Sequence, residues 1–175
     1  RKISILIGLC FILTLLISSG VFATAVFSNT HVWQDKYLAS VYAGHENATI
    51  HTFQNLADAQ LKIKTISKNE QIIILESNMK PVVKNFESVL TINGYTDVEV
   101  VSYDSYIVLQ EILFDRVAAK KGATSVAVLD PKFGVESIVI APLLREKGLV
   151  PLFLTADSEK MISSELKSPG DHIIA

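Results

Sequence analysis

The sequence predicts an α/β fold, in which an open parallel sheet carries helices on both faces in a Rossmann-like, three-layer arrangement after an apolar N-terminal helix. From residue 71 onward, short and nearly continuous apolar runs alternate with longer stretches of helical period. Continuous apolar runs are what strands buried on both faces require, and repeated β–α units imply right-handed crossovers and parallel pairing. Glycines that can end a helix with a positive φ fall between these stretches and the next strand. They are Gly94, Gly122, Gly148 and Gly170.

Residues 1–27 are predicted to be a signal peptide or a membrane anchor. Two basic residues precede an apolar run over 3–17, and Ala-Thr-Ala at 23–25 supplies the small residues found before a signal peptidase cut. If the apolar run extends over 3–27, it is long enough to cross a bilayer without cleavage. Basic residues beside an apolar span stay on the cytoplasmic side, so both alternatives predict an extracytoplasmic chain, at the cell surface or secreted.

Residues 28–69 show a mixed polar and apolar pattern, which predicts a linker or a helical stalk. Within this segment, Asn47-Ala48-Thr49 fits the acceptor pattern for N-linked glycosylation, so Asn47 is a candidate site in an exported chain. The same pattern often arises by chance, and that alternative stays open. The only cysteine, Cys10, lies in the apolar run, which leaves no disulfide framework for the exported part.

Residues 70–175 are predicted to form one α/β domain. Helical spacing appears at Val83, Phe86 and Leu90, and again over 109–117. A third helical stretch contains Pro142, whose missing amide donor predicts a kink or a late helix start. The predicted strands cover residues 71–75, 98–101, 125–129, 150–154 and 172–175.

The third helical stretch and the strand after it carry a family resemblance. Residues 133–144 read FGVESIVIAPLL, and residues 145–155 continue as REKGLVPLFLT. This run resembles the type 2 cell-wall-binding repeat, in which a phenylalanine and an acidic–small pair precede an Ala-Pro-Leu helix, a Lys-x-Gly helix end and a Pro-Ile-Leu-Leu-Thr strand. The resemblance extends from about residue 70 to the end of the chain, and the Ala-Pro-Leu block is its most specific part.

The chain also departs from the family pattern. Glu76-Ser77 stands where the family usually has paired glycines, and Ser105-Tyr106 stands where it has an Arg-Tyr pair. If those family residues contact wall polymer, this copy lacks that contact. Residues 173–175 resemble the first strand of a following repeat, which is either cut short, so that the domain is truncated at its C-terminus, or used to complete this sheet. Because the family carries tandem copies, the resemblance implies either self-association or packing against neighbouring repeats.

Ligand binding is expected beyond the carboxyl ends of the strands, where open parallel sheets form their crevice. Three acidic residues at these ends, Glu76, Asp104 and Asp130, offer a set of oxygen ligands for a divalent cation. Acidic residues at strand-to-helix turns more often cap the next helix, which is the simpler interpretation. The candidate ligand-binding residues are Ser77, Asn78, Asp104, Asp130, Phe133, Gly134 and Glu136.

The expected function is that of a non-catalytic extracytoplasmic module that binds or organises cell-envelope polymer or surface-layer protein, as the family resemblance implies. The first alternative is a small-molecule binding or sensing domain held at the membrane by the N-terminal segment, and the second is a metal-dependent hydrolase. No nucleophile elbow, phosphate-binding glycine loop or metal-ligand spacing appears, so we expect neither catalysis nor a cofactor. A net charge of −2 without a basic stripe predicts no nucleic-acid partner.

Overall fold

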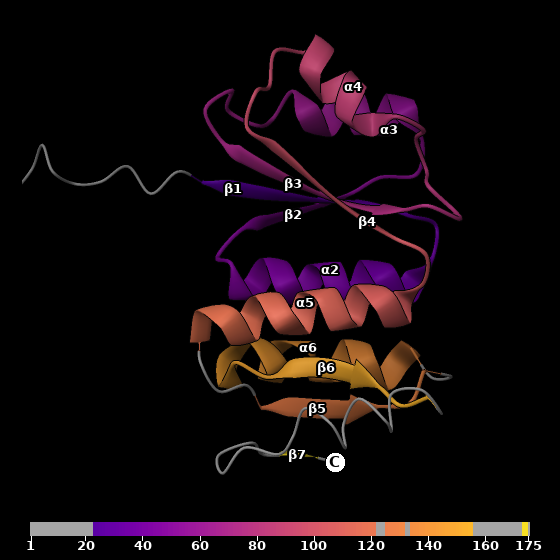
Figure 1. Ribbon diagram of the computed structural model, residues 1–175, viewed down its shortest axis with the longest axis vertical. Helices are drawn as coiled ribbons and strands as arrows, with labels where there is room; N and C mark the ends of the chain where they lie inside the picture. Colours follow the sequence, from indigo (N-terminus) through magenta and orange to yellow (C-terminus); the bar gives the residue numbers. More distant parts are fainter. Residues whose placement is uncertain (1–22, 122–124, 132–133, 156–172, 175) are drawn as a thin grey trace, which may run out of the picture.

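The computed structural model describes residues 23–121, 125–131, 134–155 and 173–174 (Figure 1). Strands and helices alternate along the chain as far as β6, as the sequence predicts. The elements are β1 (Thr24–Asn29), α2 (Trp33–His45), β2 (Thr49–Thr52), α3 (Leu56–Ile63), β3 (Gln71–Ser77), α4 (Phe86–Ile92), β4 (Val98–Tyr103), α5 (Tyr106–Lys121), β5 (Val126–Leu129), α6 (Gly134–Lys147), β6 (Val150–Phe153) and β7 (Ile173–Ile174).

Four strands form the main sheet, which we call sheet A, in the order β2-β1-β3-β4 with every pair parallel. Val26 of β1 lies opposite Ile50 of β2 on one side and Ile73 of β3 on the other. Helices α2 and α5 cover one face of sheet A, and α3 and α4 cover the other (Figure 1). The predicted parallel α/β fold with helices on both faces is confirmed for this sheet.

The remaining strands form a second parallel sheet, sheet B, in the order β6-β5-β7. The prediction of one continuous sheet is therefore wrong at the step from β4 to β5. The chain does not return to the edge of sheet A after α5 but continues to the far side of the α2 and α5 pair (Figure 1). The physical reason is that these two helices are apolar toward both sheets, so that one buried cluster runs from β3 through both helices to β5 and β6.

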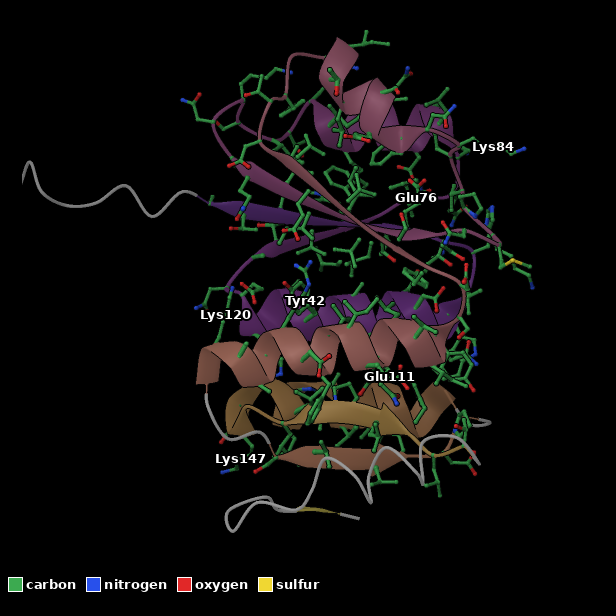
Figure 2. The ribbon with its side chains drawn as sticks, viewed as in Figure 1. Tyr42, Glu76, Lys84, Glu111, Lys120 and Lys147 are labelled. Atoms are coloured by element: carbon green, nitrogen blue, oxygen red, sulfur yellow. The ribbon has the colours of Figure 1, made fainter. Side chains whose placement is uncertain are left out.

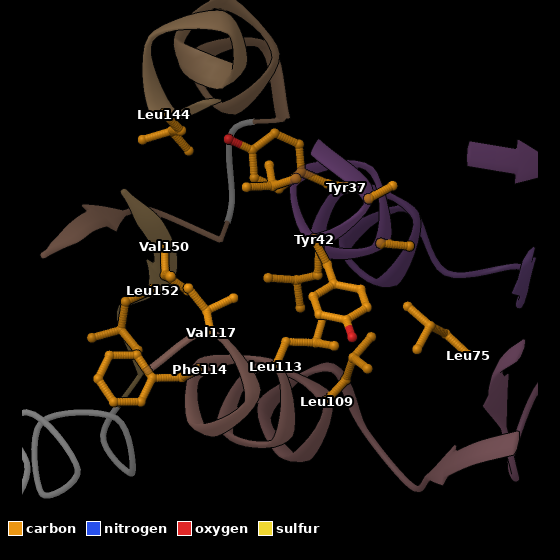
Figure 3. Close-up of a cluster of buried hydrophobic side chains, with 14 of the residues drawn as sticks. Tyr37, Tyr42, Leu75, Leu109, Leu113, Phe114, Val117, Leu144, Val150 and Leu152 are labelled. Carbon is orange, nitrogen blue, oxygen red and sulfur yellow. The ribbon is translucent and has the colours of Figure 1, made fainter. Parts of the chain in front are cut away.

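The side chains of α5 show this double contact directly. Leu113 and Val117 face Val150 and Leu152 of β6, while Leu75 of β3 lies on the opposite side of the helix pair (Figure 3). All five side chains are buried. Helices α2 and α5 therefore act as a common layer that both sheets use to bury their apolar faces.

The predicted linker or stalk over 28–69 is wrong, because these residues supply α2, β2, α3 and the end of β1. Strand β1 is a central strand, and Ala25, Val26 and Phe27 have no exposed surface. A cut after Ala25 would divide β1, and a leader that extends to Phe27 would overlap it, while the leader itself stays a prediction. Residues 1–22, which carry the predicted apolar helix, lie outside the described residues. No helix in the described part of the chain is long and apolar enough to cross a bilayer.

Helix ends follow the glycine prediction where they are described. Gly94 has φ +83° and Gly148 has φ +66°, and the amide of the next residue closes each end by donating to a carbonyl five residues earlier. Gly122 and Gly170 lie outside the described residues. Helix α6 begins at Gly134 and continues through Pro142, so the expected late start is wrong.

Replacing Phe27 with alanine tests whether β1 belongs to the folded core. Its ring has no exposed surface and packs against Phe86 and Phe53 at centroid distances of 5.3 Å and 6.1 Å. We expect Phe27→Ala to lower the free energy of unfolding by about 3–5 kcal/mol, measured by urea denaturation. Leu61→Ala, at a side chain that is 62% exposed, is the matched control and should change it by less than about 0.5 kcal/mol. Equal effects of the two variants would contradict the placement of β1.

Candidate functional site

The carboxyl ends of β1, β3 and β4 meet at one end of sheet A. The crossovers that follow β1 and β3 leave on opposite faces, which makes the space between these strand ends the topological switch point. Glu76 lies at this end of the sheet, with Lys84 beyond it (Figure 2). This is the place where the sequence predicts a ligand crevice.

Asn29, at the end of β1, fills the switch point from within. Its side chain has no exposed surface, and its Nδ2 donates to Glu76 Oε2 at 2.8 Å and to the Val83 carbonyl at 2.7 Å. The Val83 amide donates in return to Asn29 Oδ1 at 2.9 Å. Since these bonds use both ends of the amide, Asn29 fastens the loop after β3 to the end of β1 instead of facing solvent.

A second buried polar group lies on the α2 side of the same strand ends. Thr30 Oγ1 donates to Asp35 Oδ2 at 2.7 Å, and the Val32 amide donates to Thr30 Oγ1 at 3.0 Å. Tyr103, the last residue of β4, is buried beside Asp35. Burial raises the pKa of the Asp35 carboxyl, and the hydroxyls of Thr30 and Tyr103 offset part of that rise. Burial, followed by the charge of Asp35, raises the pKa of Tyr103.

Two of the predicted site residues come together on the surface of this end. Asn78 Nδ2 donates to Asp104 Oδ1 at 2.9 Å, and both side chains are exposed. Ser77 is different, because it is buried and its Oγ accepts from the Lys80 amide at 3.2 Å. Ser77 therefore shapes the turn after β3, and it is not open to a ligand.

Asp130 lies at the end of β5 in sheet B, and so it belongs to a different strand end from Asn78 and Asp104. A hollow of about 250 Å³ opens there, between β5 and the residue after β6. Gly134 begins α6 against the Trp33 indole, which would lie 3.5 Å from an added Cβ atom. Phe133 and the side chain of Glu136 lie outside the described residues. The hollow is lined by Val128, Leu129, Asp130, Pro131 and Leu154.

An aromatic cluster that the sequence did not reveal joins β6 of sheet B to α2 and α5 at this end. The buried ring of Phe153, at the end of β6, lies 5.8 Å from the rings of Trp33 and Tyr37 and 5.7 Å from that of Tyr106. Trp33 and Tyr106 are the first residues of α2 and α5, which follow β1 and β4. The carboxyl ends of β1, β4 and β6 therefore lie at the same end of the molecule.

The predicted metal set does not assemble. Glu76 is hydrogen-bonded to Asn29 and Asp104 to Asn78, while Asp130 belongs to the other sheet. Within the ranges that the structure describes, no group of three or more histidine, cysteine, aspartate or glutamate side chains is placed to hold a metal ion. The geometry gives no support to the hydrolase alternative.

Asn47, the predicted glycosylation site, lies in the exposed turn between α2 and β2. It adopts φ +53°, and the Ala48 amide donates to the Ala43 carbonyl at 2.8 Å. Asn47 thus takes the left-handed position that closes a helix end, where asparagine is the usual substitute for glycine. This backbone role accounts for the asparagine by itself, and glycosylation stays a prediction.

No protein-family model matches the chain, and no significant match was found among curated proteins or among solved structures. The resemblance to the type 2 cell-wall-binding repeat therefore stays a prediction from the residues quoted for it.

Replacing Asn29 with alanine tests its role in fastening the strand ends. The change leaves the Val83 amide and carbonyl without their partner and removes a donor from Glu76. We expect Asn29→Ala to reduce the free energy of unfolding by about 2–4 kcal/mol in urea denaturation, because unpaired buried groups cost about 1–3 kcal/mol each. Asn78→Ala removes an exposed hydrogen bond nearby and should cost less than about 0.5 kcal/mol. A cost for Asn29→Ala as small as that of Asn78→Ala would disprove the assignment.

Proposed function

We propose that the protein is a non-catalytic extracytoplasmic module that binds or organises cell-envelope polymer or surface-layer protein. The observation that carries the proposal is that the polar side chains at the switch point are engaged in hydrogen bonds within the protein. Asn29, Thr30 and Asp35 are at most 1% exposed and hold loops in place. Since a catalytic group has to reach its substrate, this arrangement favours recognition on the outer surface over chemistry in a crevice.

The surface at this end offers groups suited to a polymer. Lys80 and Lys84 are exposed in the loop after β3, beside the exposed pair Asn78 and Asp104. Trp33, which is 38% exposed, adds a partly open aromatic ring where α2 packs on β6. Cations, hydrogen-bonding side chains and an aromatic ring at one end match a polymer with anionic groups and sugar rings, which binds through many weak contacts.

The extracytoplasmic placement rests on the sequence. Basic residues at positions 1 and 2 and the apolar run over 3–17 have the order of an export signal or an anchor. A start of the exported part at residue 23 or 24 would keep β1 whole, whereas a start at Val26 would not. The proposed boundary is therefore earlier than the one first expected from the small residues alone.

The second candidate, a small-molecule binding or sensing domain, draws support from the hollow at the end of β5. Its volume of about 250 Å³ lies just below the roughly 300–1,000 Å³ of ordinary ligand pockets. Apolar side chains from Val128, Leu129 and Leu154 surround a single carboxylate at Asp130. Such a lining suits a small, mainly apolar solute.

A pull-down tests the proposed function. The full chain in mild detergent is mixed with purified envelope polymer at low and at high salt, and the retained fraction is measured. We expect retention that decreases at high salt, because screening weakens contacts of exposed lysines. Lys84→Glu should lower low-salt retention by about tenfold, which corresponds to ~1.4 kcal/mol of binding free energy.

The matched control is Lys64→Glu, at another exposed lysine, which lies at the C-terminal end of α3 and should leave retention unchanged. No retention at either salt would overturn the polymer-binding proposal and leave the small-molecule alternative. Equal losses in the two variants would show that general charge, and not this end of the molecule, governs retention.

A further inference from the structure

Strand β6 is an edge strand whose outer side lies against helices. It stands at one end of the order β6-β5-β7, and it is the strand of sheet B that packs on both α2 and α5 (Figure 1). The Val150 amide donates inward, to the Ser125 carbonyl before β5, at 3.0 Å. Because backbone groups alternate in direction along a strand, the groups that point away from β5 are the Leu149 carbonyl and those of Pro151 and Phe153.

Two side chains from the shared helix layer hydrogen-bond this outer side. Gln110 of α5 is 1% exposed, and its Oε1 accepts from the Phe153 amide at 2.6 Å. His45, the last residue of α2, places Nε2 3.0 Å from the Leu149 carbonyl oxygen. Since a carbonyl oxygen can only accept, the histidine ring is the donor. One helix therefore contacts each end of β6.

Over residues 149–153, no backbone donor on the outer side is left for a further strand. The Leu149 amide donates to the Leu144 carbonyl at 2.8 Å, where α6 ends. Pro151 has no N–H to offer. The third donor, the Phe153 amide, is taken by Gln110. An edge strand with free donors readily pairs with another chain, and covering the edge is one way in which proteins prevent this.

The bonding of Gln110 indicates that its acceptor is what this position requires. The Nε2 atom of the same side chain is buried without a hydrogen-bond partner. An apolar side chain of similar size would avoid that cost, but it would leave the Phe153 amide unpaired instead. A residue that served only to fill space would therefore not need to be a glutamine.

We propose that His45 and Gln110 are edge caps, side chains that take the place of a neighbouring strand along β6. They close this edge of sheet B to strand addition by a second copy of the chain or by another protein. Because the two caps come from different helices and hold opposite ends of the strand, they also fix the register of β6 against the α2 and α5 layer. This role is independent of what the protein binds.

Hydrogen exchange of the full chain in mild detergent, followed by mass spectrometry, tests the caps. Gln110→Met keeps the size of the side chain and removes the acceptor, so the Phe153 amide loses its buried partner. We expect exchange over residues 149–154 to become about tenfold faster, while exchange in β3 of sheet A keeps the wild-type rate. Sedimentation velocity in the same detergent should show association that grows with protein concentration, because the β6 edge opens more often.

Leu109→Ala is the matched control. Leu109 precedes Gln110 in α5, has no exposed surface and lies toward Leu75 of β3, so this change weakens the core without altering the β6 edge (Figure 3). We expect it to speed exchange in β3 at least as much as in β6 and to cause no association. The proposal is overturned if Leu109→Ala associates as strongly as Gln110→Met.

Wild-type exchange over 149–154 in Gln110→Met would also overturn the proposal, and faster exchange without association would overturn the closure against strand addition. If Gln110→Met fails to fold, His45→Phe carries the same test, because it removes the donor to the Leu149 carbonyl at the other end of β6. Wild-type exchange over 149–154 in His45→Phe then overturns the proposal.

Discussion

The structure depends on two helices that are apolar toward two sheets at once. In α2, buried side chains come in consecutive groups, Tyr37–Ala39 and Val41–Ala43, so the helix buries most of its circumference. Sheet A covers one side of the α2 and α5 pair, and α6 with sheet B covers the other (Figure 1). Helix α5 keeps an exposed stripe that includes Glu111 and Asp115, and its remaining sides are buried. The division into two sheets and the position of the aromatic cluster both follow from this shared layer.

The sequence predicted the part of the fold in which local pattern and burial agree. Strands such as β3, with Ile72, Ile74 and Leu75 fully buried, read as continuous apolar runs, and Gly94 and Gly148 marked helix ends correctly. Helix α2 was missed because a helix buried on most sides has no clear polar face, and so its period is hidden. Strand β1 was missed because its apolar residues continue directly from the apolar N-terminal run.

For the site, sequence order predicted which residues lie at strand ends but not whether they face solvent. Asn78 and Asp104 come together because β3 and β4 are neighbours in register. Asp130 was grouped with them on the assumption of a single sheet, and that assumption fails at α5. Asn29 and Asp35 could not be recognised, since their importance arises from pairing with Val83 and Thr30, and such partners are set by the fold and not by spacing.

The shared helix layer has a consequence for the order in which the chain acquires structure during synthesis. All four strands of sheet A have been synthesised once Tyr103 has been added. Helix α2, which covers one face of this sheet, then still has an apolar side that no later element yet covers. Helix α5 is the next element in the chain, and in the folded protein it packs on that side. Until α5, α6 and sheet B cover this apolar side of α2, it is a surface on which other nascent chains can associate.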